Sequence, residues 1–156
     1  PFSVSSAIAA TSDLVHEPMK ANGITLITAV DSQARVLGNK IQFEQVLINM
    51  INNARDAILS TGTAGRIDVG QILDAETVTV IIEDTGCGIP VEALPHIFEP
   101  FFTTKPVGKG TGLGGSISYG IIQDMQGSIW AENVVGGARI SIRLPLVSDS
   151  VEHETG

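Results

Sequence analysis

The sequence predicts an α/β fold of the α+β kind, in which helices cover one face of a mixed, mostly antiparallel sheet. The stretch 39–60, NKIQFEQVLINMINNARDAILS, repeats its apolar residues at close to the helical period. Short runs rich in β-branched residues and bounded by turn residues lie on both sides of it. Helical and strand patterns alternate irregularly along the chain, which favours a mixed sheet with its helices on one side.

Length and composition fit one domain with a sizeable core, since the chain has 156 residues of which 43% are hydrophobic. The net charge of −8, without a Lys/Arg run, argues against a nucleic-acid surface. Apolar runs stay below the ~18 residues of a membrane span, so we expect no direct membrane contact and no signal peptide. Cys87 is the only cysteine, which suits a reducing, cytoplasmic compartment. The chain begins at Pro1, so we expect it to be a piece of a longer protein.

The elements before the first glycine-rich turn follow from local signals. Asn39 or Gly38 can cap the start of the central helix, and Gly62 follows its end. A short turn at 74–75 joins two strands. In chain order we expect a helix over 3–20, strands over 24–30 and 35–37, the central helix over 39–60, and strands over 66–73 and 76–83.

The remaining elements alternate with glycine-rich loops. We expect a short helix near 92–97, a helix after the loop at 106–115 that runs to about 126, and strands over 128–132 and 138–144 with a turn at Gly136-Gly137. The tail from Ser148 is polar and acidic. We therefore expect one domain over 1–147 and a disordered tail over 148–156.

The central helix carries a polar cluster at an unfavourable place. Asn49, Asn53 and Asp56 share one face at helical spacing, although Asn and Asp side chains compete for backbone hydrogen bonds in a helix interior. A solvated stripe on a half-buried helix is the simpler explanation. The functional alternative is Mg²⁺, which prefers oxygen ligands and completes its shell with water and phosphate. The histidines are scattered along the chain, so a zinc site is not expected.

Asp84 ends a predicted strand and is followed by Gly86 and Gly88. Glycines at these positions let a flat ligand approach the backbone, and the carboxylate can accept from an exocyclic amine. An ordinary Asp-Gly turn is the simpler alternative. The triplet Asp84-Thr85-Gly86 also occurs in aspartic proteases, but that class requires an all-β domain, and the long central helix contradicts it.

The loop at 106–115, PVGKGTGLGG, is a candidate phosphate site. Its glycines leave N–H groups free to point at a ligand, and the following helix adds its N-terminal dipole. Lys105 and Lys109 are the only basic residues between Arg66 and Arg139. The alternative is a flexible surface loop with incidental lysines.

Two other nucleotide motifs fit this loop less well. Gly110, Gly112 and Gly115 satisfy the dinucleotide pattern G-x-G-x-x-G, with Glu132 downstream, but no apolar strand leads into Gly110. A Walker A motif needs Ser or Thr after the lysine, and Gly110 follows Lys109.

The order of these motifs resembles the catalytic and ATP-binding domain of sensor histidine kinases. That domain belongs to the superfamily of gyrase, heat-shock chaperone, histidine kinase and mismatch-repair ATPases. An Asn-bearing helix, Asp-x-Gly-x-Gly, FEPFF with TTK, and Gly-x-Gly-x-Gly follow one another over about 1–146. The resemblance implies a two-layer α/β sandwich that binds ATP and Mg²⁺ between the central helix and a flexible ATP lid.

The resemblance also implies roles for single residues. Asn53 matches the Mg²⁺ ligand, Asn49 faces the phosphates as a catalytic residue and second candidate ligand, and Asp84 accepts the adenine amine. Lys105 and Lys109 are the candidate cations for the phosphates. The remaining nucleotide-binding candidates are Asp56, Gly86, Gly88, Ile89, Phe98, Phe102, Gly110, Thr111, Gly112, Leu113 and Gly114.

The implied activity is donation of the γ-phosphate to a histidine on a separate dimerisation hairpin. His16 lies only 33 residues before Asn49, which is too close for that hairpin, so the acceptor lies outside this chain. The implied partners are the dimerisation and phosphoacceptor domain of the same kinase and a response regulator receiver domain downstream. The parent protein can be anchored in a membrane. One departure is Gly115, where the family usually has Leu, and we expect it to loosen the junction of the lid.

Three rival functions share these motifs. A conformational ATPase of the gyrase type typically carries a Glu general base one turn before the Mg²⁺ asparagine. Asn49 occupies that place, and an amide cannot take a proton at neutral pH. A serine protein kinase of the anti-sigma type and a pseudo-enzyme that only binds nucleotide are the other two.

Overall fold

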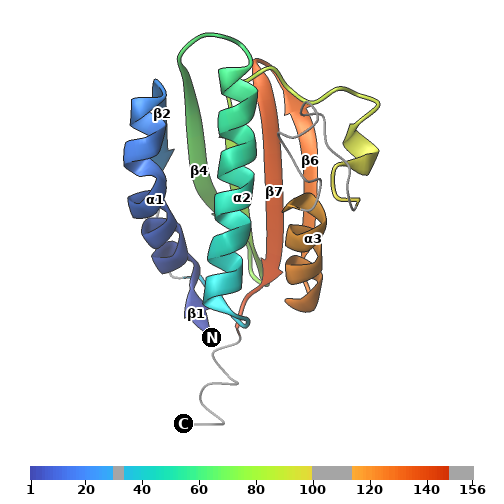
Figure 1. Cartoon of the computed structure of the whole chain (residues 1–156). Helices are drawn as coiled ribbons and strands as arrows, with labels where there is room; N and C mark the ends of the chain where they lie inside the picture. Colours follow the sequence, from blue (N-terminus) through green and yellow to red (C-terminus); the bar gives the residue numbers. More distant parts are fainter. Residues whose placement is uncertain (30–33, 100–113, 148–156) are drawn as a thin grey trace, which may run out of the picture.

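A mixed sheet with helices on one face makes up the structure, a computed structural model that describes residues 1–29, 34–99 and 114–147. Figure 1 shows α1, α2 and α3 side by side over that face. In chain order the elements are β1 (Phe2–Ser3), α1 (Val4–Ala21), β2 (Ile24–Thr28), β3 (Arg35–Val36), α2 (Lys40–Leu59), β4 (Gly65–Leu73), β5 (Thr77–Asp84), the 3-10 helix η1 (Leu94–His96), α3 (Gly114–Asp124), β6 (Ser128–Val134) and β7 (Gly137–Pro145).

The strand order of the main sheet is β2-β4-β5-β7-β6. Only β2 and β4 are parallel, and the other neighbours are antiparallel. The predicted two-layer sandwich with a mostly antiparallel mixed sheet is therefore confirmed. The sequence did not predict β1, a two-residue strand that pairs with β3.

The central helix α2 begins one residue after the predicted cap. The Asn39 side chain accepts a hydrogen bond from the Gln42 N–H at 3.0 Å and so satisfies one of the helix's free N–H groups. Ile41, which also follows the apolar period, lies in the first turn and is 76% exposed. The buried stripe consists of Phe43, Val46, Leu47, Met50, Ile51, Ala54 and Ile58.

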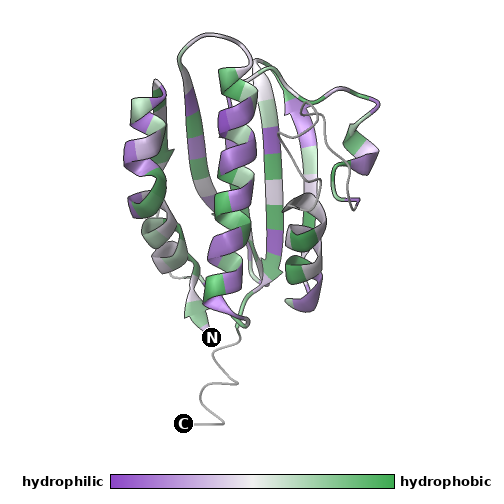
Figure 2. Cartoon of the chain, in the orientation of Figure 1, coloured by the Kyte–Doolittle hydropathy of each residue, from purple (hydrophilic) through white to green (hydrophobic). Residues whose placement is uncertain are grey.

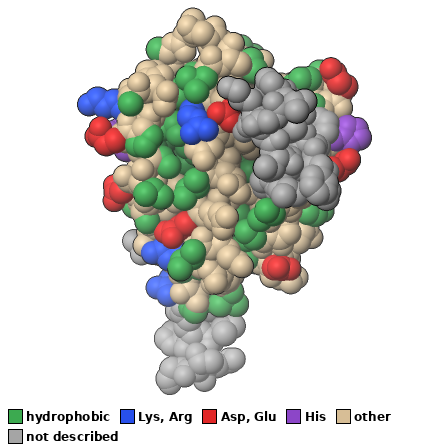
Figure 3. All heavy atoms as spheres, in the orientation of Figure 1, with side chains coloured by type: hydrophobic (Ala, Val, Ile, Leu, Met, Phe, Trp, Pro, Cys, Tyr) green, Lys and Arg blue, Asp and Glu red, His purple; other side chains and the backbone are tan. Residues whose placement is uncertain are grey.

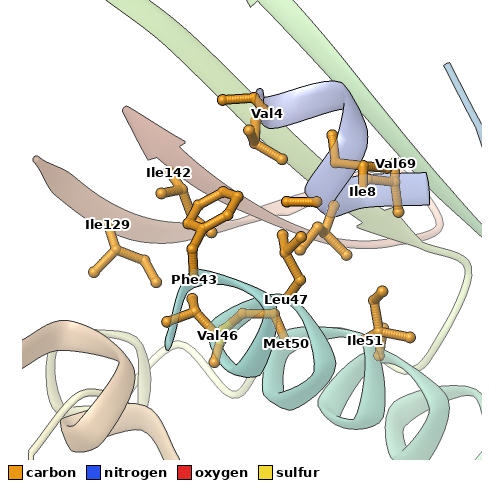
Figure 4. Close-up of a cluster of buried hydrophobic side chains, with 14 of the residues drawn as sticks. Val4, Ile8, Phe43, Val46, Leu47, Met50, Ile51, Val69, Ile129 and Ile142 are labelled. Carbon is orange, nitrogen blue, oxygen red and sulfur yellow. The ribbon is translucent and has the colours of Figure 1, made fainter. Parts of the chain in front are cut away.

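The core is formed by this stripe, by α1 and by the inward side chains of the strands. Figure 4 shows Phe43 and Leu47 of α2 among Val4 and Ile8 of α1 and Ile142 of β7. Side chains of this size contribute about 1.5–3 kcal/mol each to folding when fully buried. The colouring of Figure 2 shows the helices with a hydrophobic and a hydrophilic side, as packing against a sheet requires.

Strand β5 sets the position of its last residue by simple alternation. Val78, Val80 and Ile82 are buried, and the residues between them are only half-buried. Asp84 continues the inward series at the end of the strand and is 8% exposed. A two-residue side-chain period thus places a carboxylate on the helix side of the sheet.

Two loop predictions need correction. Val134 pairs with Gly137, so the β6–β7 turn is Val135-Gly136, one residue earlier than predicted, and Gly136 has φ +84°. The predicted helix near 92–97 is only the short η1. The predicted disordered tail, 148–156, lies outside the described residues. Of the helices that the structure describes, none combines the length and the apolarity that a membrane crossing needs.

Candidate functional site

The candidate site lies between α2 and the segment that follows β5. Figure 1 shows this segment leaving the sheet at the end where α2 also ends, and passing to η1 near the start of α3. The hairpin of β6 and β7 lies beside the sheet end of β5, because β7 pairs with β5 along its whole length. Strand β5, the hairpin strands β6 and β7, and helix α2 therefore meet around Asp84.

The Asp84 carboxylate is held by main-chain donors. Its Oδ1 accepts from the Gly86 N–H at 2.8 Å, and the Ala138 N–H donates to the same carboxylate. Burial raises the pKa of Asp84 above its ordinary value, because desolvation outweighs the two hydrogen bonds. A carboxylate has about four acceptor sites, so acceptor capacity remains for a ligand amine.

The loop after Asp84 is fastened to the rest of the domain at successive residues. The Thr85 N–H donates to the Arg66 carbonyl at 3.1 Å, and Thr85 Oγ1 accepts from the Arg66 N–H at 2.9 Å. The Cys87 N–H donates to the Ala57 carbonyl of α2 at 3.2 Å. These bonds hold the loop between the sheet and α2.

The glycines of this loop are required by different contacts. A β-carbon on Gly86 would come within 2.6 Å of the Ala57 carbonyl carbon and 2.8 Å of the Ile58 nitrogen, so Gly86 lets the loop lie directly on the backbone of α2. Gly88 has φ +79°, which L-residues rarely adopt. The sequence led us to expect a ligand close to the backbone at Gly86. On the side where a β-carbon would point, it is helix α2 that lies against this glycine.

The polar face of α2 is divided among different partners. Asn49 Nδ2 donates to the Ser118 hydroxyl of α3 at 3.3 Å. Asn53 is exposed, and its side-chain amide makes no hydrogen bond within the residues that the structure describes. Asp56 Oδ1 is 3.0 Å from the Arg55 guanidinium. Asn53 is therefore the member of the predicted cluster that is open to a ligand.

The described residues on the two sides of 100–113 lie in contact with each other. The Phe98 ring stacks on the Tyr119 ring of α3 with centroids 6.2 Å apart. A β-carbon on Gly115 would collide with the Ile97 carbonyl oxygen. Gly115 therefore permits a tight contact between α3 and the chain before the loop, which corrects the expectation that it loosens this junction.

Several predicted site residues lie outside the part of the chain that the structure describes. Gly114 is the first residue of α3, and the residues before it, back to residue 100, are not described. Figure 3 draws them in grey. The predictions that fall there are Phe102, Lys105, Lys109, Gly110, Thr111, Gly112 and Leu113.

Sequence reasoning missed the residues that are far from the site in the sequence but contact it in the fold. Asn133 of β6 binds the main chain of Ile89, and Gly137 lies so close to the Asp84 carbonyl that no β-carbon fits there. Ser118 is fully buried on α3. The signal in the sequence was weak. It consisted of a serine within a predicted helix and an asparagine two residues before a hairpin turn.

The donor set fits a nucleotide with its metal. Asp84 keeps acceptor capacity beside a rigid glycine loop, and Asn53 offers an amide oxygen, a ligand type that Mg²⁺ accepts. Among residues 1–29, 34–99 and 114–147, no three His, Cys, Asp or Glu side chains gather in a metal-binding arrangement. A metal here would rest on amide oxygens and on the phosphates of the ligand.

Comparisons with known proteins give concordant similarities. The family described as histidine kinase-, DNA gyrase B-, and HSP90-like ATPase matches residues 38–148. The two-component sensor PprA of Pseudomonas aeruginosa is 40% identical over 153 residues, which cover 95% of this chain and 17% of PprA. This chain thus spans about a sixth of that relative's length.

Solved structures with the same fold include the nucleotide-free catalytic domain of the histidine kinase ThkA. Its TM-score is 0.82 at 34% identity, with 94% of this chain and 97% of that chain covered. A second structure contains ThkA in complex with the response regulator protein TrrA. It gives a TM-score of 0.76 at 32% identity and covers 94% of this chain and 41% of that chain.

Proposed function

This chain belongs to the family of histidine kinase-, DNA gyrase B- and HSP90-like ATPases, and on that premise we propose that it is the Mg·ATP-binding catalytic domain of a sensor histidine kinase. One observation carries the proposal: a nearly buried carboxylate, Asp84, keeps acceptor capacity beside a glycine loop that is fixed against α2. Asp84 accepts a hydrogen bond from the exocyclic amine of adenine. Gly86, Gly88 and Ile89 lie beneath the base.

The phosphates extend from the base toward α2 and the start of α3. When bound, Mg²⁺ neutralises phosphate charge and orients the transferred group. Asn53 holds the metal through its amide oxygen, with Asn49 as the second candidate ligand. The remaining phosphate charge is balanced by the ammonium groups of Lys105 and Lys109. The N–H groups of 110–114 add hydrogen bonds to the phosphates.

The reaction is phosphoryl transfer to a histidine on a dimerisation hairpin. A nitrogen of that histidine forms a bond to the γ-phosphorus, the bond from this phosphorus to its bridging oxygen breaks, and ADP leaves. Such a transfer depends mainly on positioning and on charge neutralisation. This chain supplies both, while the acceptor histidine supplies the nucleophile.

Hydrolysis to free phosphate is the second candidate function, and one contact argues against it. A hydrolase of this family needs a general base one turn before Asn53, and that residue is Asn49. Its amide nitrogen donates to Ser118, and an amide does not accept a proton at neutral pH. Asn49 therefore suits orientation of the phosphates better than activation of water.

Partners and compartment follow from the same proposal. ThkA has been crystallised with the response regulator TrrA, and a receiver domain of that class is the downstream partner that we propose for the parent kinase of this chain. The phosphoacceptor hairpin is the direct partner. ATP and a single thiol point to the cytoplasmic side, also for a parent protein that is anchored in a membrane.

The test combines this chain with the phosphoacceptor hairpin of its parent kinase and γ-labelled Mg·ATP. We expect an acid-labile, base-stable phosphoprotein on the hairpin and little release of free phosphate. Acid-stable label would favour a serine kinase, and rapid phosphate release without the hairpin would favour an ATPase. Binding of ATP with neither outcome would leave only a nucleotide-binding module.

A further inference from the structure

We propose that Asn133 of β6 is a positioning residue for the base-binding loop, an inference that rests on the proposed function. Asn133 lies 44 residues from this loop in sequence, on the edge strand of the sheet. Its amide holds Ile89, the last residue of the Asp84–Ile89 loop. Through that contact it fixes where the loop presents Asp84 and the glycines to adenine.

Both polar groups of the Asn133 side chain take part. Oδ1 accepts from the Ile89 N–H at 2.7 Å, and Nδ2 donates to the Ile89 carbonyl at 2.7 Å. A pair of bonds to the N–H and C=O of one residue is what a neighbouring strand residue makes in an antiparallel ladder. The side chain thus extends the sheet by one pairing, at a place where the backbone has already left it.

The register explains why this contact matters for Asp84. Asp84 pairs with Ala138 across β5 and β7, and Ala138 pairs with Asn133 across β7 and β6. The three residues form one row across the sheet, and the Ala138 N–H donates to the Asp84 carboxylate. The loop therefore starts at one end of this row and is tied back to its other end.

The middle of the loop has little space to adjust. Gly86 lies against α2, and a β-carbon on Gly88 would come within 3.1 Å of Asn133 Oδ1. The Asp84–Ile89 loop is thus held at both ends and in its middle. Without the Asn133 bonds, the Cys87–Ala57 bond at 3.2 Å would be the one hydrogen bond that still ties the loop beyond Gly86 to the rest of residues 1–29, 34–99 and 114–147.

The test compares N133A with N22A in this chain. Asn22 is a matched control because its Nδ2 also donates to a main-chain carbonyl, that of Pro18 at 2.8 Å, at the exposed end of α1. Calorimetry measures the dissociation constants of Mg·ATP and of magnesium tripolyphosphate, which lacks base and ribose. We expect N133A to weaken ATP about tenfold, the effect of losing one to two net hydrogen bonds, and to leave tripolyphosphate unchanged.

The control variant N22A should change neither constant. Unchanged ATP affinity in N133A, or an equal loss for ATP and tripolyphosphate, would overturn the positioning role. N133D adds a second check, because it keeps an acceptor for the Ile89 N–H but sets a carboxylate against the Ile89 carbonyl. It should weaken ATP at least as much as N133A.

Hydrogen exchange without nucleotide separates this inference from the proposed function. In N133A the amides of both Gly86 and Ile89 should exchange faster than in the wild type, because the loop loses its anchored end. Faster exchange at Ile89 alone would overturn the inference. If the wild-type chain binds no ATP, the proposed function fails, whereas the exchange result still decides whether Asn133 orders the loop.

Discussion

Asn49 on α2 donates a hydrogen bond of 3.3 Å to the hydroxyl of Ser118, which is fully buried on α3. This bond joins the helix with the polar face to the helix that follows the glycine-rich segment. It turns the Asn49 nitrogen toward α3 and leaves Oδ1 for the site. The orientation of a proposed phosphate-facing residue is thus set by a side chain 69 positions away.

The first prediction concerns this pair. S118A removes the acceptor and leaves the Asn49 nitrogen unpaired in a half-buried place, so we expect a loss of about 1–2 kcal/mol in the free energy of unfolding. A double-mutant cycle with N49A should give a coupling of about 1 kcal/mol in urea denaturation. S128A, an exposed serine on β6, is the control and should be neutral. Additive effects of S118A and N49A would show that the bond contributes nothing.

The second prediction concerns the contact of Asp84 with adenine. D84N replaces an acceptor oxygen with an amide that faces the adenine amine, and we expect ATP affinity to fall by about 2–4 kcal/mol in calorimetry. D13N is a suitable control, because Asp13 is an exposed aspartate on α1 and takes no part in the contacts of the loop. Equal affinities for the wild type and D84N would contradict the assignment.

The third prediction follows from the pKa of Asp84, which burial raises above its unfolded-state value near 3.8. Between these two pKa values the native state binds more protons than the unfolded state, so stability falls as the pH rises through this window. The unfolding free energy of the wild type should therefore rise relative to that of D84N as the pH falls from 7 to 4. Urea titrations at several pH values measure this difference. A difference independent of pH would mean that desolvation does not outweigh the hydrogen bonds to Asp84 and that its pKa is not raised.

The fourth prediction separates metal binding from nucleotide binding. N53A should weaken Mg·ATP much more than metal-free ATP, because Asn53 is the open amide of the polar face. N52A is a matched control on the same helix, where the Asn52 oxygen accepts from Arg55 at 3.4 Å. Titrations of the wild type, N53A and N52A with and without Mg²⁺ give the six affinities. Equal weakening of both nucleotide forms by N53A would assign it a structural role.

The fifth prediction uses Cys87, the only thiol of the chain, which is exposed between Gly86 and Gly88. A base lying on this loop would shield the sulfur, so ATP should slow alkylation by a bulky maleimide even without Mg²⁺. Tripolyphosphate should give no protection. The modification rate can be followed by mass spectrometry. An unchanged rate with verified ATP binding would place the base elsewhere or turn the thiol away from it.

Local patterns were sufficient to predict most of the framework. The helical period of 39–60 predicted α2 and its polar face, and the strand signal over 76–83 predicted that Asp84 lies at the end of β5. Local patterns failed where distant segments decide. Ile41 fits the apolar period but is exposed, whereas Phe43 in the same turn is fully buried. The partners of Asn133 and Ser118 depend on sheet register and helix packing, which single-residue spacing does not contain.

The contact between Gly115 and the Ile97 carbonyl has a consequence for protein engineering. Stabilising designs often replace an unusual residue with the one that is most frequent in its family, which here would be leucine. At this position the frequent residue would push α3 away from the chain segment that ends in Phe98. Because the contact is made by a main-chain oxygen, no substitution at position 97 would relieve it, and a frequency-based design should keep Gly115.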